Sequence, residues 1–271
     1  MAAGTDRVEC WRVGDVLGGV TVLRADIRSQ FPRHFHDDYT VGLVTRGANR
    51  FAYRHDRLVA EAGTLCLADP GEVHTGEADE EGWSYWTVHV PPEALAALRA
   101  DLHEAAAGPP DFAAGVIADP EAVRRFAAFF RTLRHAGPLE RESRAVAALG
   151  YLIAAHAAER PQALVRRADG GVAAQVREIL ADRLAEPVTL GELEEATGVG
   201  RFRLLRAFRR AYGLPPHAWQ TQMRLARAHA LIAAGTPIAA AAADTGFADQ
   251  AHLTRLFKRT FGYTPGVLAR G

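Results

Sequence analysis

The sequence predicts an α+β protein of two domains, a β-barrel or β-sandwich followed by helices and then an all-α domain with two helix-turn-helix motifs joined by a helix. Three observations support this prediction. Residues 10–90 contain short β-rich runs separated by Gly, Asp and Pro. Helical periodicity begins near Pro92 and continues to the end of the chain. Within that helical part, one spacing pattern occurs twice.

The β-rich part contains the runs VGLVTRG, RFAYRHD, GTLCLADPGEVH and WSYWTVHV, which are rich in β-branched and aromatic residues and end at turn signals. Several short strands this close together are typical of a barrel or sandwich. In the last run, Trp83, Tyr85, Thr87 and His89 share one face of a strand, and Trp86 lies on the other. Both interpretations of which face points inward stay open.

Two amphipathic helices are expected next, at residues 120–135 and 141–158. Their apolar positions are Val123, Phe126, Ala127, Phe130 and Leu133 in the first, and Val146, Leu149, Gly150, Ile153 and Ala157 in the second. These stripes either pack on the β-domain or form an interface between two copies of the chain. One barrel covers only part of such a surface, so we expect a homodimer formed through the N-terminal part and these helices.

A polar segment with a Gly-Gly pair follows these helices and is typical of a linker. We therefore expect a first domain at residues 1–160, a linker at residues 161–171 and a second domain at residues 172–271.

Charge differs between the two parts of the chain. Residues 201–271 contain 11 Arg and Lys against 2 Asp and Glu, whereas the remaining residues contain 21 against 30. A basic C-terminal part indicates a domain that binds a polyanion. A solvated basic face is the alternative.

Several classes of protein are excluded by composition. No apolar run approaches the roughly 18–20 residues of a membrane span, and the N-terminus has no secretory signal pattern. Cys10 and Cys66 lack the spacing of a metal site and are too few for a disulfide framework. We expect a cytoplasmic protein that does not contact membranes.

The repeated pattern is L-x-R-x-F-[R/K]-x-x-x-G-x-x-P, present as LLRAFRRAYGLPP and LTRLFKRTFGYTP. The matched pairs are Leu204 and Leu253, Arg206 and Arg255, Phe208 and Phe257, Arg209 and Lys258, Gly213 and Gly262, and Pro216 and Pro265. Before each copy lies a short helical segment ended by a glycine turn. Short helix, turn and second helix make a helix-turn-helix, whose second helix fits the DNA major groove.

Local signals support the first helix of each motif. Thr189 and Glu192 form a capping-box pattern, with Leu190 and Leu193 expected to face inward. In the second copy, Pro237 suits the first helical position. Residues 217–235 are patterned as one helix of about 27 Å. The second helix of each motif is called a reading helix below. A connecting helix of that length holds the two reading helices near successive major grooves, which are about 34 Å apart.

Position within the two reading helices gives the expected DNA contacts. They are Arg201, Phe202, Leu205 and Arg206 in the first copy and Gln250, Ala251, Thr254 and Arg255 in the second. Arg and Gln read guanine and adenine bidentately, and apolar side chains contact thymine methyl groups. Arg209 and Lys258, one turn further on, are expected to neutralise phosphates. The alternative for Arg206 and Arg255 is an exposed surface charge.

These motifs resemble the DNA-binding domain of the AraC/XylS family of transcription regulators. The resemblance lies in Arg206-x-Phe208, Gly213, RLARAHALI, GFADQAHLTRLFKRTFGYTP and Arg270. It implies a regulator, more specifically an activator, that binds double-stranded operator DNA and acts with RNA polymerase. Two departures are Ala251, where the family often has Ser, and Gly200, where a Ser cap is common. The first puts a base or phosphate contact at residue 251 in doubt.

The N-terminal part resembles the two short motifs of a cupin barrel, the usual sensor module of this family. The resemblance lies in His34-x-His36 and in a later stretch with Gly63, Pro70, Gly71 and His74. It implies a cupin-like domain that binds a small-molecule effector. The residues expected to line the pocket are His34, His36, Tyr39, His74 and Trp86.

Cupin enzymes use such histidines as metal ligands, typically with a Glu a few residues after the first pair. Here residues 37–41 contain no Glu. We therefore expect no resident metal, no other cofactor and no catalytic residues. The alternative is that His34, His36 and His74 bind a transition metal as a facial set, in a metal-dependent cupin enzyme fused to a DNA-binding tail.

Overall fold

The computed structural model describes residues 6–14, 16–78, 81–102, 108–158 and 171–270. The described residues belong to two compact units, one within residues 1–159 and one within residues 160–270. The linker expected at residues 161–171 lies almost wholly outside the described residues, so its bounds stay a prediction. Among the described helices, none has both the length and the apolar character needed to cross a bilayer.

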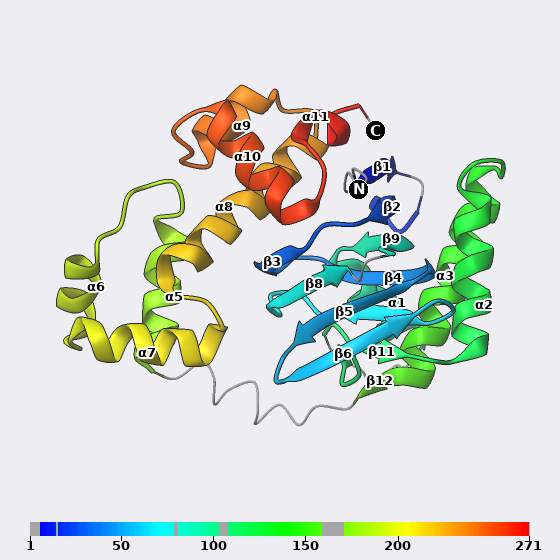
Figure 1. Cartoon of the computed structure of the whole chain (residues 1–271), viewed down its shortest axis with the longest axis horizontal. Coiled ribbons are helices and arrows are strands. Elements are labelled where there is room, and N and C mark those ends of the chain that lie inside the picture. Colours follow the sequence, from blue (N-terminus) through cyan, green and yellow to red (C-terminus); the bar gives the residue numbers. More distant parts are fainter. Residues whose placement is uncertain (1–5, 15, 79–80, 103–107, 159–170, 271) are drawn as a thin grey trace. The chain divides into compact units, whose positions relative to one another are not determined.

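Two antiparallel sheets form the centre of the first unit (Figure 1). Their strands are β1 Arg7–Val13, β2 Val20–Ile27, β3 Phe31–His34, β4 Tyr39–Arg46, β5 Ala48–Tyr53, β6 Asp56–Glu61, β7 Leu65–Ala68, β8 His74–Ala78, β9 Trp83–Val90 and β11 Val116–Ile117. The larger sheet has the order β1-β2-β9-β4-β7-β11 and the smaller β3-β8-β5-β6. A short pair, β10 Asp111–Phe112 with β12 Ala157–Ala158, lies outside both. The prediction of a sheet-rich first domain is confirmed.

The middle of the larger sheet is covered on both faces, since Val41 and Val44 of β4 are both buried although they lie on opposite faces of the strand. Val41 on β4 and Val88 on β9 belong to the core shared with the helices, whereas Val44 packs with Phe51 and Tyr53 of the smaller sheet. Alternation along each strand thus places one set of side chains under the helices and the other between the two sheets.

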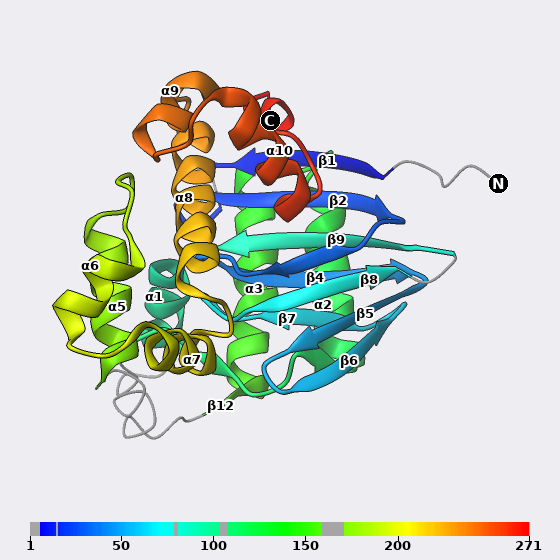
Figure 2. The ribbon, with the colours of Figure 1, turned by 60° about the vertical axis from the view of Figure 1, so that its left-hand side comes forward.

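The described residues of this unit also form the helices α1 Pro92–Leu102, α2 Pro120–Thr132 and α3 Pro138–His156. The last two lie side by side along one face of the larger sheet (Figure 2). The Asp119 carboxylate caps α2 by accepting from the Glu121 backbone N–H at 2.8 Å, in agreement with the acceptor role of N-cap residues. α3 begins three residues before the expected start because Pro138 occupies its first turn.

The apolar stripes of α2 and α3 are mainly core of this domain. Phe126 is fully buried and Ile153 is 3% exposed, and both pack in the cluster that contains the sheet residues Val41 and Val88. Of the two interpretations left open by the sequence, packing on the β-domain therefore accounts for most of this surface.

The second unit is helical. Its helices are α5 Val172–Asp182, α6 Leu190–Thr197, α7 Arg201–Tyr212, α8 Pro216–Ala233, α9 Ile238–Asp244, α10 Gln250–Phe261 and α11 Pro265–Leu268. The capping box at α6 is present: the Glu192 N–H donates to Thr189 Oγ1 at 3.2 Å, and the Thr189 N–H donates to Glu192 Oε2 at 2.7 Å. Leu193 is buried, but Leu190 is 38% exposed, so the expectation that it faces inward is wrong.

Both copies of the repeated pattern adopt the same local structure. The residues Leu204, Phe208, Leu253 and Phe257 are fully buried at equivalent positions of α7 and α10. Gly213 and Gly262 cap these helices with φ of 71° and 80°, a left-handed conformation that favours glycine. The prolines that end the pattern occupy the first turn of α8 and of α11. In the second motif Pro237 is the N-cap of α9, one residue before the expected position.

Candidate functional site

The first reading helix, α7, exposes its basic residues opposite its buried face. Arg206 and Arg209 are exposed, whereas Leu205 is half-buried. Arg201 is exposed and its Nε donates to Glu194 Oε2 of α6 at 2.8 Å, a link between the two helices of the motif. The Phe202 side chain lies outside what the structure describes. The expected contact residues of this copy thus lie on one helix, with Arg201 already paired to an acidic neighbour.

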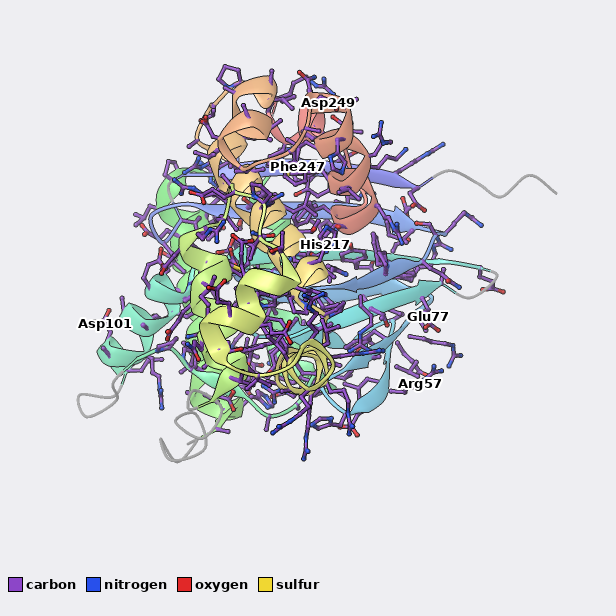
Figure 3. All side chains as sticks on the ribbon, turned by 90° about the vertical axis from the view of Figure 1, so that its left-hand side faces the viewer. Arg57, Glu77, Asp101, His217, Phe247 and Asp249 are labelled. Atoms are coloured by element: carbon purple, nitrogen blue, oxygen red, sulfur yellow. The ribbon has the colours of Figure 1, made fainter. Side chains whose placement is uncertain are left out.

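The second reading helix, α10, presents Gln250, Ala251 and Arg255 to solvent, with Thr254 half-buried. Asp249 caps this helix by accepting from the His252 N–H at 2.6 Å. Phe247 and Asp249 lie on the turn before α10, and His217 lies near the start of α8 (Figure 3). The turn places the N-terminal end of α10 at the surface, where the positive end of the helix dipole favours phosphate.

Basic residues also occupy the last turn of each reading helix. These are Arg209 and Arg210 in α7, and Lys258 and Arg259 in α10. Neither helix has an acidic residue in its first turn. The two helices thus carry basic residues at equivalent positions, a charge that favours contact with phosphates.

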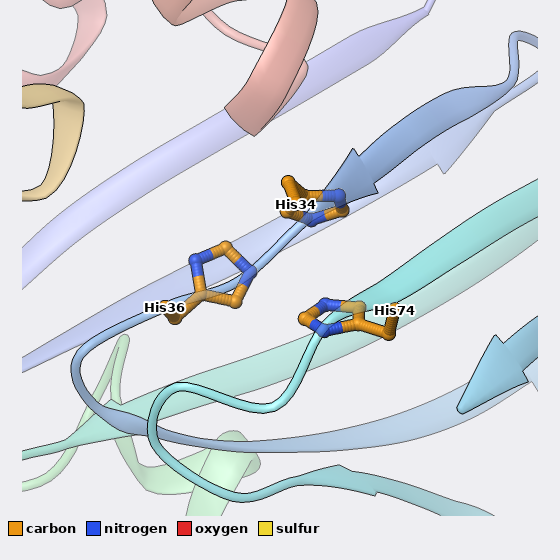
Figure 4. A group of neighbouring side chains, drawn as sticks. All are labelled: His34, His36 and His74. Atoms are coloured by element: carbon orange, nitrogen blue, oxygen red, sulfur yellow. The ribbon is translucent and has the colours of Figure 1, made fainter. Parts of the chain in front are cut away.

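A cluster of histidines lies in the first unit (Figure 4). His34 ends β3 and His74 begins β8, and the two are direct partners across the antiparallel pair. His36 follows in the segment between β3 and β4. One ring nitrogen from each of the three lies within 4.8 Å of one from each of the others. Strand pairing therefore joins the two motifs that are about 40 residues apart in the sequence.

Backbone carbonyl oxygens accept hydrogen bonds from two of these rings. His34 Nδ1 lies 2.7 Å from the Pro32 carbonyl oxygen, and His74 Nδ1 lies 2.9 Å from that of Glu72. A carbonyl only accepts, so each Nδ1 carries the proton and each Nε2 carries the lone pair. Burial lowers the pKa of His34 to about 3, with a further contribution from His74. Burial also lowers the pKa of His74, so both imidazoles are neutral at neutral pH.

His89 on β9 is a fourth member of the cluster. Its ring centroid lies 5.0 Å from that of His36, and its Nδ1 lies 3.2 Å from Thr40 Oγ1, its cross-strand partner on β4. The sequence places His89 on the same face of this strand as Trp83 and does not decide whether that face points inward. The structure places that face between the two sheets, since Val88 on the other face packs under the helices.

Tyr39 and Trp86 are not brought to the histidine cluster. Tyr39 is 3% exposed, packs edge-on against Phe112 and donates to the Pro110 carbonyl. Trp86 stacks between Trp11 and Phe130, with ring centroids 5.6 Å away in each case. Both side chains point to the helix-covered face of the sheet, where Tyr39 is part of the core and Trp86, partly buried, packs against it.

Two family models match the chain. The model of the AraC-like ligand binding domain matches residues 17–149, and that of a helix-turn-helix domain matches residues 193–271.

Relatives resemble the chain over most of their length. The HTH-type transcriptional regulator YbfI of Bacillus subtilis (strain 168) is 28% identical over 244 residues, which cover 84% of this chain and 82% of that protein. The arabinose operon regulatory protein of Escherichia coli (strain K12) is 25% identical over 249 residues, or 86% and 80% of the two chains. Among solved structures, unsaturated fatty acid bound wild-type ToxT from Vibrio cholerae matches with a TM-score of 0.54 and 11% identity, covering 96% of this chain and 93% of that one, which shows a shared fold.

Proposed function

The chain belongs to the AraC family of transcription regulators, and from this premise we propose that an effector bound at its histidine cluster controls how α7 and α10 bind operator DNA. Models of a ligand-binding and a helix-turn-helix domain match the chain, and the relatives are named as regulatory proteins. The expectation of a DNA-binding regulator rather than a metal-dependent enzyme is therefore confirmed.

One observation supports the DNA-binding part of the proposal most directly: α7 and α10 expose equivalent residues opposite identical buried Leu and Phe pairs. The proposed base contacts are Arg201, Phe202, Leu205, Arg206, Gln250, Ala251, Thr254 and Arg255. Arg209 and Lys258 neutralise phosphates. The two helices enter successive major grooves on one face of the duplex.

The effector site is proposed at His34, His36 and His74, with His89 added. Three of these residues were expected from the sequence, and all four lie between the two sheets. Effector binding shifts the population between two states of the protein that differ in operator affinity. The proposed outcome is activation of transcription by RNA polymerase. The proposed location of the protein is the cytoplasm, where that transcription takes place.

We also propose that the regulator acts as a homodimer, each protomer reading one half-site. Because Ile153 is buried with most of both stripes, the proposed interface uses the apolar residues that remain exposed on α3. Leu139 is 79% exposed and Val146 is 37% exposed, and a spacing of seven residues places them on one face of the helix.

Selection of bound sequences from random duplex DNA tests the proposal. The full chain should enrich half-sites that each have two parts about 10 base pairs apart, one per reading helix. Residues 172–271 alone should bind duplex DNA with log K falling against log salt at a slope of about −5, if five or six phosphates are contacted. Absence of an enriched motif, or a flat salt dependence, contradicts the proposal.

A further inference from the structure

We propose that His34, His36 and His74 bind one divalent transition-metal ion, and that the effector binds this ion as an oxygen donor. The sequence favoured a metal-free pocket because no Glu follows the histidine pair. The geometry of the three rings leads to a different conclusion. Binding of the effector to the ion rests on the proposed function, but metal binding itself does not.

The separation of the donor atoms fits one ion. The three nitrogens lie within 4.8 Å of one another. A zinc–imidazole bond of about 2.0–2.1 Å in tetrahedral geometry separates ligand nitrogens by about 3.4 Å. Movements of roughly 1 Å close that difference, which ordinary χ2 rotation of an imidazole supplies. His36 lies between strands, where the backbone also has room to adjust.

The orientation of the rings is that of metal ligands. The Pro32 and Glu72 carbonyls accept from Nδ1 of His34 and His74. Metal-binding histidines characteristically donate their second N–H to a carbonyl or carboxylate, which sets the tautomer and aims the other nitrogen at the ion. The Nε2 lone pairs of His34 and His74 are thus available to bind a cation.

The donor set favours zinc and its neighbours in the first transition row. Among the described residues the group is purely imidazole, with no thiolate or carboxylate among its members, and imidazole suits Zn, Cu, Fe and Ni rather than Mg or Ca. Three neutral ligands leave the full double positive charge on the ion and at least one coordination position open. An anionic oxygen donor is the chemistry that this position accepts.

His89 marks the open side. Its ring lies 5.0 Å from that of His36, next to Thr40, the residue four positions after His36. His89 does not belong to the group of three close donors. His89 and Thr40 both carry a polar hydrogen-bonding group, and so both are placed to hold an oxygen of the effector while it binds the ion.

Zinc titration of the full chain, after chelator treatment and in competition with a chromophoric chelator, tests the metal site. We expect one tight equivalent per chain, weakened at least about 100-fold by His36→Ala and by His74→Ala. The matched control is His55→Ala, an exposed histidine of the same domain, which should bind zinc as the wild type does. Equal affinity of the wild type and both cluster variants overturns the proposal.

Circular dichroism identifies any variant that has lost its fold. His36 is half-buried and lies outside the strands, so His36→Ala is the variant of choice. The open coordination position is tested by adding acetohydroxamate, a bidentate oxygen donor, to the Co²⁺-loaded chain. A shift of the visible absorption supports an open position. An unchanged spectrum overturns the proposal that the effector binds the ion. Operator binding that responds to effectors in a chain without tight zinc binding leaves the proposed function intact and removes only this inference.

Discussion

Arg224 on α8 donates from Nη1 to the carbonyl oxygen of Gly246, 3.0 Å away, and so links the long helix to the turn of the second helix-turn-helix. Its Nε and Nη2 donate to the carbonyls of Leu184 and Glu186 at 2.7 and 2.8 Å. One guanidinium thus connects three segments of the DNA-binding unit: α8, the loop after α5 and the turn before α10. This arrangement holds the two motifs at a set spacing.

Replacing Arg224 by Lys should weaken this connection, because Lys keeps the charge but loses the planar fork of donors. We expect a loss of about 1–3 kcal/mol in the unfolding free energy of residues 172–271, measured by urea titration. Binding to DNA that contains both parts of a half-site, one per reading helix, should weaken more than binding to DNA that contains one part. Arg227→Lys, exposed one turn away, is the control. Equal losses for the two variants would show that the hydrogen bonds do not set the spacing.

Gly246 should not tolerate a side chain. Its φ is +76°, and a Cβ there would lie 2.3 Å from the Ala185 carbonyl oxygen. Gly246→Ala therefore combines backbone strain with a clash and should cost more than about 2 kcal/mol of unfolding free energy. Gly235→Ala has a similar φ of +93° with no described atom within 4 Å, and should show the strain alone. Thermal unfolding of both variants measures the difference, and identical values would contradict the clash.

Arg206→Ala and Arg255→Ala separate base reading from phosphate binding. If each arginine contacts guanine bidentately, each change should cost about 1–3 kcal/mol and relax preference at one base pair. Lys258→Ala should weaken binding to all sequences about equally. Competition between operator and random duplex measures both effects. If the arginine variants lose equally on the two DNAs, these residues contact the backbone.

The stability of the DNA-binding unit should fall in acid because of His229. Burial lowers the pKa of His229 from 6.5 to about 4, and the ring stacks on Phe257 with Nε2 2.8 Å from the Tyr263 hydroxyl. Between these two pH values the unfolded chain binds a proton that the folded chain does not. Unfolding free energy should therefore decrease as pH falls from 6.5 to about 4, by at most about 1.4 kcal/mol per pH unit.

Urea titrations of residues 172–271 at several pH values test this dependence on His229. His229→Gln should remove that part of the slope, whereas the exposed His217→Gln should keep it. A slope unchanged in His229→Gln would assign the acid sensitivity to other groups.

A homodimer through α3 should dissociate when its exposed apolar face is charged. Leu139→Glu with Val146→Glu should shift sedimentation from dimer to monomer and weaken operator binding at low protein concentration, while residues 172–271 alone bind as before. Val59→Glu introduces the same charge at an exposed apolar residue of β6 and should leave the dimer intact. A wild-type chain that sediments as a monomer at every concentration rules out this interface.

Local features of this protein followed from its sequence. Leu204 and Phe208 are four apart, and helical geometry alone places them on one buried face. Gly213 follows the helix where a left-handed cap is needed, and Thr189 with Glu192 closes a capping box. Each of these depends on neighbours within a few residues, which is why the two motifs and their exposed basic faces were predictable.

The tertiary structure decided which faces were covered. Alternation along β9 separates Trp86 from His89. Only the packing of α2 and α3 on one side of the sheet places Trp86, partly buried, against the core and leaves His89 beside His36. Leu190 lies three residues before Leu193 and therefore on the same side of α6, but it is exposed because no element of the described chain covers it. Pairing of β3 with β8 then brings two of the clustered histidines together. Burial and long-range pairing depend on segments far apart in the chain, and no local pattern encodes their position.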